Sequence, residues 1–315
     1  MKAAVFEKKL TLQAVPEPVR DDNEALVRVS MIGICNTDVE IVNGYMGFQG
    51  IPGHEFVGIV EAAETASWVG KRVVGEINAG CGECEACRKG MARHCPNRST
   101  LGIYRRNGAF AEKLVLPESN LFEVPQTVPD EIAVFTEPLA AALEILEQTH
   151  IVPATPVAVI GDGKLGLLIA QVMQLVGCDV HVFGKARSKL DLAERFGIQT
   201  HLVETGIDRR FPVVIEASGN ATGFASALAL IKPRGTLVLK STYHGELSFD
   251  ASGLVINEIT VIGSRCGRFG PALRLLAKNL IKTKELISEI FPFDEIEAAF
   301  EFAQNSKALK VLLKV

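Results

Sequence analysis

The chain has 315 residues, of which 48% are hydrophobic and 22% are charged, and its net charge is −4. This composition excludes disordered and low-complexity classes, and the slight acidic excess argues against a large basic surface for nucleic acid. At about 100–200 residues per domain, the length suggests two domains. The N-terminal residues lack an apolar signal-peptide core, and Gln171 and Gln174 interrupt the longest apolar stretch. We therefore expect a cytoplasmic protein that neither enters a membrane nor binds nucleic acid.

The pattern of predicted elements changes in the middle of the chain. The first 120 residues read as short strands punctuated by glycine, proline and asparagine, so this part is predicted to be mostly β. A helix is expected over 139–149, and from residue 156 strands and helices alternate, which predicts a parallel sheet with helices on both faces. The expected strands are 156–160, 179–183, 212–217, 236–240 and 259–263, with helices up to 176 and over 188–197 and 221–231. Two helices (268–281 and 294–304) and a strand (308–315) complete the pattern.

A glycine-rich turn follows the first strand of this alternating part. Gly161, Gly163 and Gly166 match G-x-G-x-x-G, and the turn leaves a predicted strand and opens a predicted helix. The first glycine permits the tight turn, the second allows close approach of a pyrophosphate, and the third allows helix and strand to pack closely. We predict a dinucleotide site that also includes Lys164 and Leu165; the alternative is an ordinary strand–helix turn of another α/β protein.

The end of the second strand bears on which dinucleotide binds. An NAD site carries Asp or Glu there, about 20 residues beyond the glycine turn, to bind the ribose 2′-hydroxyl. This chain has Gly184, followed by Lys185 and Arg187. A missing carboxylate removes repulsion of a 2′-phosphate, and the cations could bind one, so we predict NADP(H), with NAD(H) less favoured. The alternative is a basic turn that is merely solvated. Ser218 follows strand 212–217 and is expected to pass under the cofactor.

Four of the seven cysteines are clustered in the sequence. Cys81, Cys84, Cys87 and Cys95 are spaced C-x2-C-x2-C-x7-C. In a reducing compartment such a cluster favours metal binding over disulfides, and four thiolates satisfy zinc with no open position. We therefore predict a lobe, residues 78–98, folded around a structural zinc. An iron–sulfur cluster and a set of free or oxidised thiols are the alternatives.

A second set of candidate metal ligands is dispersed along the first half of the chain. Cys35 follows a predicted strand, His54 and Glu55 follow Gly53, and Glu137 precedes Pro138. Zinc accepts cysteine, histidine and carboxylate ligands, and a three-ligand site leaves a fourth position for water or substrate. Spacing alone leaves open that the cysteine is a small buried hydrophobe and the histidine a structural residue.

Together these motifs resemble a known family. Cys35-x-Thr37-Asp38, Gly53-His54-Glu55, the four-cysteine lobe, Glu137-Pro138-Leu139 and the glycine turn occur in the order seen in zinc-dependent medium-chain dehydrogenases/reductases. The resemblance spans essentially the whole chain and is greatest to the polyol and sugar branch (sorbitol, threonine and glucose dehydrogenases). It implies an α/β fold with a GroES-like, mostly-β catalytic domain (1–149 and 266–315) and a Rossmann domain with a doubly wound parallel sheet (150–265).

The resemblance also implies a catalytic zinc site. Cys35 and His54 would bind the ion, and Glu55 and Glu137 compete for the third place, because family members differ over which carboxylate binds directly. Asp38 would orient the imidazole of His54.

The remaining implied roles concern the reaction and the assembly. Thr37 would pass the alcohol proton outward, and Lys310 stands where some relatives carry an arginine that contacts the pyrophosphate. The implied activity is hydride transfer between NADP(H) and a small alcohol or carbonyl compound, with a polyol or sugar expected first and a simple alcohol or aldehyde second. A cofactor-binding regulatory protein without activity is the alternative of another class. The relatives are commonly homodimers or homotetramers, and we expect the same here.

Overall fold

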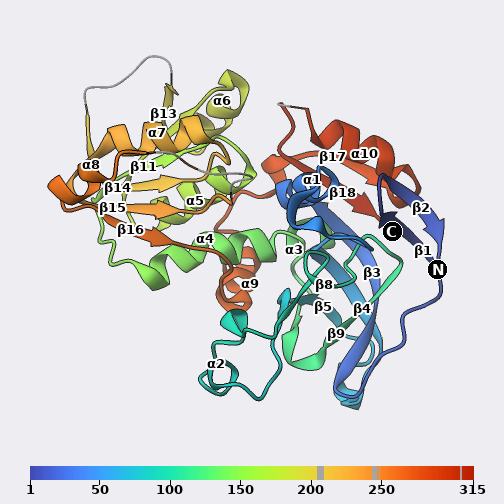
Figure 1. The fold of residues 1–315 in the computed structure, drawn as a ribbon. Helices are drawn as coiled ribbons and strands as arrows, with labels where there is room; N and C mark the ends of the chain where they lie inside the picture. Colours follow the sequence, from blue (N-terminus) through green and yellow to red (C-terminus); the bar gives the residue numbers. More distant parts are fainter. Residues whose placement is uncertain (204–208, 243–246, 248, 306) are drawn as a thin grey trace. The chain divides into compact units, whose positions relative to one another are not determined.

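The computed structural model describes residues 1–203, 209–242, 247, 249–305 and 307–315. Internal contacts divide the chain into two units (Figure 1): Met1–Glu137, Phe269–Lys278 and Ile287–Val315 form the first, and Pro138–Arg268 and Asn279–Leu286 form the second. The predicted domain boundary at residue 150 differs from this division, because contacts assign residues 138–149 to the second unit. The limits of the functional domains stay a prediction. No helix of the described residues is long and apolar enough to cross a membrane.

The first unit is organised by a seven-stranded sheet. Its strands are β3 (Glu24–Ile34), β4 (Glu55–Ala62), β5 (Arg72–Gly75), β9 (Lys113–Pro117), β10 (Leu121–Glu123), β17 (Ile287–Pro292) and β18 (Lys310–Lys314). Their order is β10-β5-β4-β3-β18-β17, and β9 also pairs with β3. The long central strand β3 is antiparallel to both β4 and β18, so the start of β4 and the start of β18 meet the end of β3. This register brings together residues that lie far apart in the sequence.

Smaller elements complete the first unit. Two short sheets consist of β1 (Lys2–Phe6) with β2 (Leu10–Ala14), and of β6 (Asn78–Ala79), β7 (Ser99–Leu101) and β8 (Arg105–Arg106). The helices are α1 (Asn36–Val42), α2 (Glu85–Arg88), α3 (Asp130–Ala133), α9 (Phe269–Ala277) and α10 (Ile296–Ala303). This unit is therefore mostly β, as the sequence predicts.

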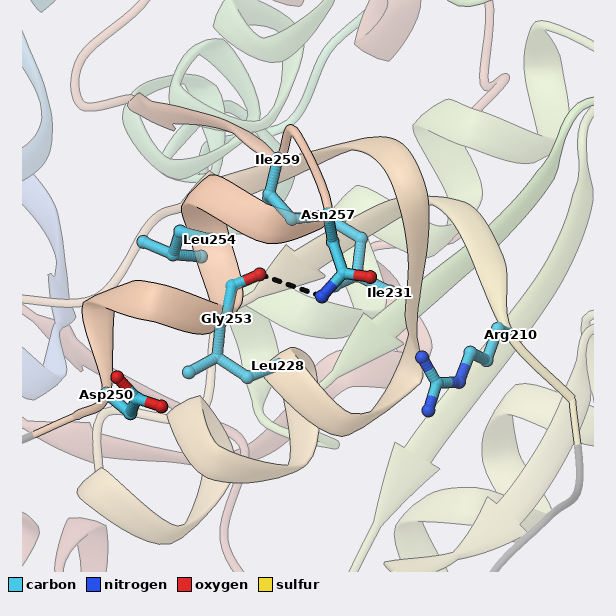
Figure 2. A pocket seen from close by; sticks show the side chains of 8 residues that line it. All are labelled: Arg210, Leu228, Ile231, Asp250, Gly253, Leu254, Asn257 and Ile259. Carbon is cyan, nitrogen blue, oxygen red and sulfur yellow. Dashed lines mark hydrogen bonds between the residues drawn. The ribbon is translucent and has the colours of Figure 1, made fainter.

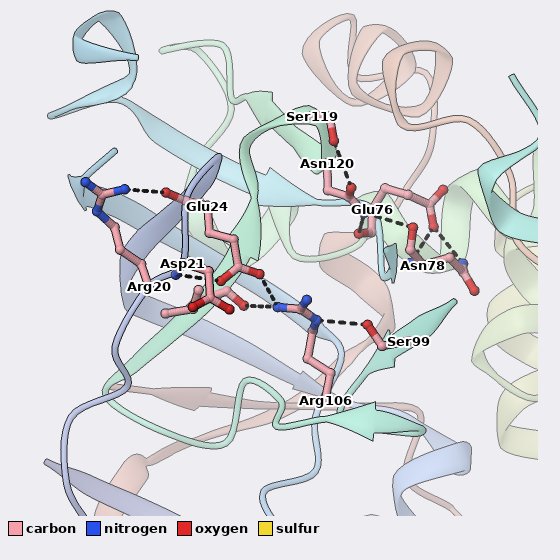
Figure 3. A network of polar contacts seen from close by, with 10 residues as sticks. Arg20, Asp21, Glu24, Glu76, Asn78, Ser99, Arg106, Ser119 and Asn120 are labelled. Atoms are coloured by element: carbon pink, nitrogen blue, oxygen red, sulfur yellow. Dashed lines mark hydrogen bonds and ion pairs between the residues drawn. The ribbon is translucent and has the colours of Figure 1, made fainter. Parts of the chain in front are cut away.

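Polar networks tie the small sheet to the large one (Figure 3). The Arg106 guanidinium on β8 forms an ion pair with Glu24 Oε1 of β3 at 2.8 Å and donates to Ser99 Oγ at 3.0 Å. The side chain of Asn120 donates to the main-chain oxygens of Glu76 (2.6 Å) and Asn78 (3.0 Å). These contacts satisfy half-buried polar groups and hold the segment that leads into the cysteine lobe.

The second unit is a six-stranded parallel sheet with helices (Figure 1). The strands are β11 (Pro156–Ile160), β12 (Asp179–Gly184), β13 (Gln199–Leu202), β14 (Phe211–Glu216), β15 (Ile231–Leu239) and β16 (Thr260–Gly263), in the order β13-β12-β11-β14-β15-β16. The helices are α4 (Thr136–Gln148, whose first two residues belong to the first unit), α5 (Lys164–Leu175), α6 (Arg187–Arg195), α7 (Ala221–Leu230) and α8 (Ala251–Ile256). This is the doubly wound order of a Rossmann sheet, which confirms the predicted fold class.

Two elements of the second unit escape the sequence prediction. Strand β13 has the sequence QTHL and lies at the edge of the sheet, so it lacks the apolar run of a buried strand. Helix α8 has six residues, which is too short to display a 3.6-residue period.

A cavity of about 220 Å³ lies beside the amino ends of β14, β15 and β16 (Figure 2). Leu228, Ile231, Leu254 and Ile259 give it an aliphatic lining, and Arg210, Asp250, Gly253 and Asn257 complete it. The glycine turn follows the carboxyl end of β11, whereas the cavity lies at the amino ends of the strands. The cavity is therefore separate from the predicted cofactor site.

Two histidines are stacked on β12 and on its neighbour β13, which is an edge strand of this sheet. His181 Nδ1 lies 2.8 Å from His201 Nε2, and Arg209 donates to His181 Nε2 at 2.8 Å. His181 Nε2 also lies 3.3 Å from Asp179 Oδ1, so a donor and an acceptor face the same ring nitrogen. Burial lowers the pKa of both histidines. Asp179 opposes this effect at His181, and the neighbouring charges of His181 and Arg209 lower the pKa of His201 further.

These lowered pKa values predict a pH-dependent loss of stability. Between the folded-state pKa values and the unfolded value near 6.5, the unfolded chain binds more protons, so stability is complete above about pH 6.5 and falls as the pH decreases below it. His201→Gln keeps a hydrogen-bonding side chain beside His181 and does not titrate. Thermal unfolding followed by circular dichroism from pH 7.5 to 5.5 should therefore show a smaller fall in Tm for this variant than for the wild type. Parallel falls would contradict the assignment.

Candidate functional site

The first cluster lies where β3 ends and β4 begins. Cys35 follows β3 directly, and His54 and Glu55 stand at the start of β4, opposite Gly33 in the register. One ligand atom from each of Cys35, His54 and Glu55 lies within 4.8 Å of the others. A Cβ atom at Gly33 would collide with Glu55 Oε2, so a side chain at this position would move the carboxylate from its place. The strand register thus creates the cluster from residues that are distant in sequence.

Asp38 holds this cluster in place from the first turn of α1. It is fully buried; its Oδ2 accepts from the Cys35 main-chain nitrogen at 2.8 Å, and its Oδ1 accepts from His54 Nδ1 at 3.0 Å. Burial disfavours the imidazolium, but the charge and hydrogen bond of Asp38 outweigh it and raise the pKa of His54 well above its usual value. With Nδ1 engaged, His54 Nε2 is left as the atom that can bind a metal. Thr37 Oγ1 lies 3.8 Å from Cys35 Sγ.

Glu55 is held on its other side by a lysine from the last strand. The ammonium of Lys310, on β18, is fully buried, bonds to Glu55 Oε2 and lies 5.6 Å from the centre of the Phe135 ring. Burial lowers the pKa of Lys310, but the charge of Glu55 more than compensates and raises it. In this structure the predicted pyrophosphate contact of Lys310 would require the pair with Glu55 to separate. Sequence patterns miss this pairing, because its partners lie 255 residues apart.

Glu137 lies near the cluster but outside the group of three. It stands in the first turn of α4, and burial raises its pKa to about 7, an effect opposed by His54 and reinforced by the carboxylates of Glu55 and Glu76. A carboxyl group with such a pKa is partly protonated at neutral pH. Of the two carboxylates that the sequence leaves in competition, the structure therefore brings Glu55 to Cys35 and His54.

The donor set fits a zinc ion. Glu55 Oε1 is buried and has no hydrogen-bond partner among the described residues, and a bare buried carboxylate oxygen is costly unless a cation binds it. Cys35 supplies a thiol sulfur and His54 a ring nitrogen, so the three donors are those that zinc accepts. Three protein ligands leave a fourth position open, which is the arrangement of catalytic zinc sites.

The four lobe cysteines form a second, separate cluster. Their sulfur atoms lie within 4.8 Å of one another, and Cys84 Sγ is 3.7 Å from Cys95 Sγ. Zinc–sulfur bonds of about 2.3 Å in a tetrahedron place sulfur atoms about 3.8 Å apart. Main-chain N–H groups of Glu83 and Cys84 lower the pKa of Cys81 to about 6, whereas burial raises that of Cys87 to about 11. The arrangement fits a closed, structural zinc site.

The glycine turn has the geometry of a phosphate-binding loop. Gly161 has φ +125°, and a Cβ there would lie 2.6 Å from Ala217 O, while a Cβ at Gly166 would collide with Gly161 O. Gly163 is the N-cap of α5, and no atom lies within 4 Å of the place its Cβ would take. The approach to Gly163 is therefore open, and Lys164 and Leu165 begin the helix behind it.

The predicted residues at the ends of β12 and β14 are hydrogen-bonded within the second unit. Lys185 Nζ donates to Thr222 Oγ1 at 3.3 Å, and the Ser218 hydroxyl donates to Glu216 Oε1 at 2.5 Å. Arg187 forms ion pairs with two carboxylates of its own helix, those of Asp191 (2.7 Å) and Glu194 (2.8 Å). The cations proposed for a 2′-phosphate thus have protein partners here.

Asp162 is a residue that the sequence analysis overlooked. Its Oδ2 accepts from the main-chain nitrogens of Lys185 (2.8 Å) and Ala186 (2.7 Å), so its side chain lies against Gly184. The available signal was its place inside the glycine motif, next to the strand end that lacks a carboxylate.

Comparison with known proteins agrees with both units. Residues 21–126 match the family described as "Alcohol dehydrogenase GroES-like domain", and residues 165–279 match "Zinc-binding dehydrogenase". An L-threonine 3-dehydrogenase of Coxiella burnetii is 31% identical over 96% of this chain and 95% of its own length. A sorbitol dehydrogenase of Halalkalibacterium halodurans is 29% identical over 96% of this chain and 94% of its own length.

Two solved structures carry different dinucleotides. A short chain alcohol dehydrogenase from E. coli CFT073, complexed with NADH, superimposes with a TM-score of 0.92 at 27% identity, covering 100% of this chain and 99% of its own. A "putative zinc-binding dehydrogenase" from Sinorhizobium meliloti 1021, bound to NADP, superimposes with a TM-score of 0.90 at 28% identity and with the same coverage. The comparisons thus agree on the fold and differ in the dinucleotide.

The two clusters predict a zinc content of two ions per chain, each lost independently. Cys84→Ser should bring the content of the purified protein close to one and lower its Tm, because a structural zinc stabilises the loop that binds it. Cys35→Ala should also leave one zinc. Cys178 is a free thiol outside both clusters. The variant Cys178→Ser therefore serves as the control and should retain two zinc ions. Elemental analysis by mass spectrometry measures this, and an unchanged content in both cluster variants would refute the assignment.

Proposed function

The chain belongs to the zinc-dependent alcohol dehydrogenase (medium-chain dehydrogenase/reductase) superfamily, and from this premise we propose that it interconverts a polyol or sugar and the corresponding carbonyl compound. As a member it is a zinc-dependent NAD(P) dehydrogenase of the polyol and threonine type. The observation that carries the proposal is the Cys35–His54–Glu55 cluster, with a bare carboxylate oxygen and an imidazole fixed by Asp38.

The substrate class is supported by the acidic character of the cluster. Glu55 and Glu137 lie close enough to influence each other electrostatically, and Glu76 adds a third carboxylate nearby. Glu137 is engaged neither by Lys310 nor in the group of three, and a carboxyl group that accepts hydrogen bonds from hydroxyl groups suits a hydroxyl-rich molecule better than a simple alcohol. Sorbitol dehydrogenase is among the relatives.

The chemistry divides between the bound groups and the chain. Zinc supplies Lewis acidity that lowers the pKa of a hydroxyl group, and the nicotinamide accepts or returns the hydride. Asp38 accepts a hydrogen bond from His54 Nδ1, so Nε2 is the ring nitrogen that would bind the ion. Thr37, beside Cys35, is proposed to receive the hydroxyl proton and pass it outward. Lys310 compensates the negative charge of Glu55, and both side chains are fully buried.

We propose that the chain prefers NADP(H) to NAD(H). Its support is the absence of a side chain at Gly184 and the two cations that follow, Lys185 and Arg187. Asp162 places a negative charge at the same turn and opposes this preference. The balance between these charges makes NAD(H) a usable second cofactor.

A homodimer is the proposed minimal assembly, and the edge of the second unit's sheet supports it. Among the described residues β16 pairs with β15 alone, so no second strand covers its outer side, and the Gln148 side chain donates to one of its main-chain oxygens, Gly263 O, at 3.3 Å. Val261 on β16 is 42% exposed, and Val255 and Ile256 on the neighbouring α8 are 76% and 78% exposed. An open apolar edge pairs readily with a second copy of itself around a two-fold axis.

Val261→Lys should weaken this assembly, because it places a charge on the proposed interface. Multi-angle light scattering after gel filtration is expected to show a particle of at least two chains for the wild type and half that mass for the variant. Val152→Lys changes another exposed valine of the same unit, 47% exposed, and should leave the mass unchanged. A monomeric wild type would disprove the proposal.

Cys35→Ala tests the enzymatic proposal. We expect turnover of polyols in a substrate panel to disappear while NAD(P)H binding, measured by nicotinamide fluorescence, stays near the wild-type value, because the variant removes a metal ligand of the first unit only. Asp38→Asn should reduce turnover by about 10–100-fold, the usual effect of losing the residue that orients a ligating histidine. Turnover that survives Cys35→Ala would exclude the proposed site.

A further inference from the structure

The end of β12 is the place where many dinucleotide-binding sheets carry a carboxylate for the adenosine ribose. In this chain Gly184 occupies that place, and its space is already filled. A Cβ atom at Gly184 would lie 2.5 Å from Asp162 Oδ2 and 2.6 Å from Asp162 Cβ. The Asp162 side chain, which comes from the glycine turn after β11, thus lies where a side chain of residue 184 would begin.

The two oxygens of Asp162 differ in their surroundings. Oδ2 accepts two hydrogen bonds, from the main-chain nitrogens of Lys185 and Ala186 at 2.8 and 2.7 Å. Oδ1 has no hydrogen-bond partner among the described residues, and the side chain is only partly buried. The carboxylate is therefore fixed by one oxygen and keeps the other free as an acceptor beside the glycine turn.

The positive charges around Asp162 do not cancel this acceptor. Lys185 points its ammonium to Thr222, and Arg187 is paired with Asp191 and Glu194. Lys189 is close enough for the charge of Asp162 to raise its pKa, although burial lowers it overall. No ion pair joins Asp162 to a cation in the described part of the chain, so its charge acts on whatever binds at the turn.

We propose that Asp162 supplies the carboxylate that recognises the ribose 2′-hydroxyl of NAD(H), in place of the missing side chain at position 184. This inference rests on the proposed function. The free oxygen accepts a hydrogen bond from a hydroxyl group and repels a phosphate group at the same carbon. Asp162 therefore keeps NAD(H) usable in a turn whose lysine and arginine residues favour NADP(H).

Asp162→Asn is the direct test. The amide oxygen can still accept from Lys185 N and Ala186 N, while an NH₂ group replaces the free oxygen. We expect the Kd of NADH, measured by nicotinamide fluorescence, to rise about tenfold, the usual size of a lost hydrogen bond to a charged group, and the Kd of NADPH to stay equal or fall. Wild-type kcat/KM with each cofactor provides the reference ratio. Glu258→Gln removes one charge from the opposite end of the sheet and should change neither Kd.

A double variant keeps the test decisive if the turn is disturbed. Asp162→Gly with Gly184→Asp moves the carboxylate to the end of β12, where Gly184 has an ordinary φ, and should restore NADH binding that Asp162→Gly alone loses. An unchanged NADH-to-NADPH ratio in Asp162→Asn, or no restoration in the double variant, overturns the inference and leaves the proposed function intact. A wild type that binds neither dinucleotide overturns both.

Discussion

The buried ion pair between Glu55 and Lys310 is the contact on which the first unit's cluster depends. A carboxylate transferred from water into a protein interior costs several kcal/mol unless a cation and hydrogen bonds compensate it. Lys310 provides that compensation with an ammonium that is itself fully buried. Removal of either partner would leave an uncompensated charge at a cost of about 3–5 kcal/mol.

This pair also joins the last strand to the first half of the chain. Glu55 begins β4 and Lys310 begins β18, and both strands are antiparallel to β3, which leads into Cys35. The last strand is therefore part of the metal-binding framework. One oxygen of Glu55 serves Lys310, and the other is left for the ion, so a single side chain links the electrostatics of the core to the chemistry of the open position.

The sequence predicts the features that depend on local spacing. Four cysteines within one short segment can all reach the same ion when the segment folds into a loop, and a glycine turn between a strand and a helix has a narrow set of conformations. The doubly wound sheet follows from the alternation of apolar strands and helices. The grouping of Cys35 with His54 and Glu55 required the register of β3 against β4, which a local pattern does not contain. The resemblance to known enzymes indicated Cys35 and His54 and left Glu55 and Glu137 in competition for the third place.

Other features depend on contacts that no sequence period encodes. Lys310 reaches Glu55 across 255 positions, and Asp162 matters because Gly184, on the next strand, leaves it room. Both contacts join residues that only the tertiary packing brings together. The preference of the cluster for Glu55 over Glu137 belongs to the same class, since it follows from which carboxylate the strand register brings to Cys35.

Gly33 shows how closely such packing ties two positions together. Because its missing side chain makes room for the Glu55 carboxylate, a larger residue at position 33 would displace that carboxylate from its place beside Lys310 unless position 55 had first become shorter. The order of such changes is therefore restricted: a lineage that abandons the metal can replace Glu55 first and then fill position 33, but the reverse order passes through an intermediate with a steric clash. Once position 33 is filled, restoring Glu55 alone no longer restores the site.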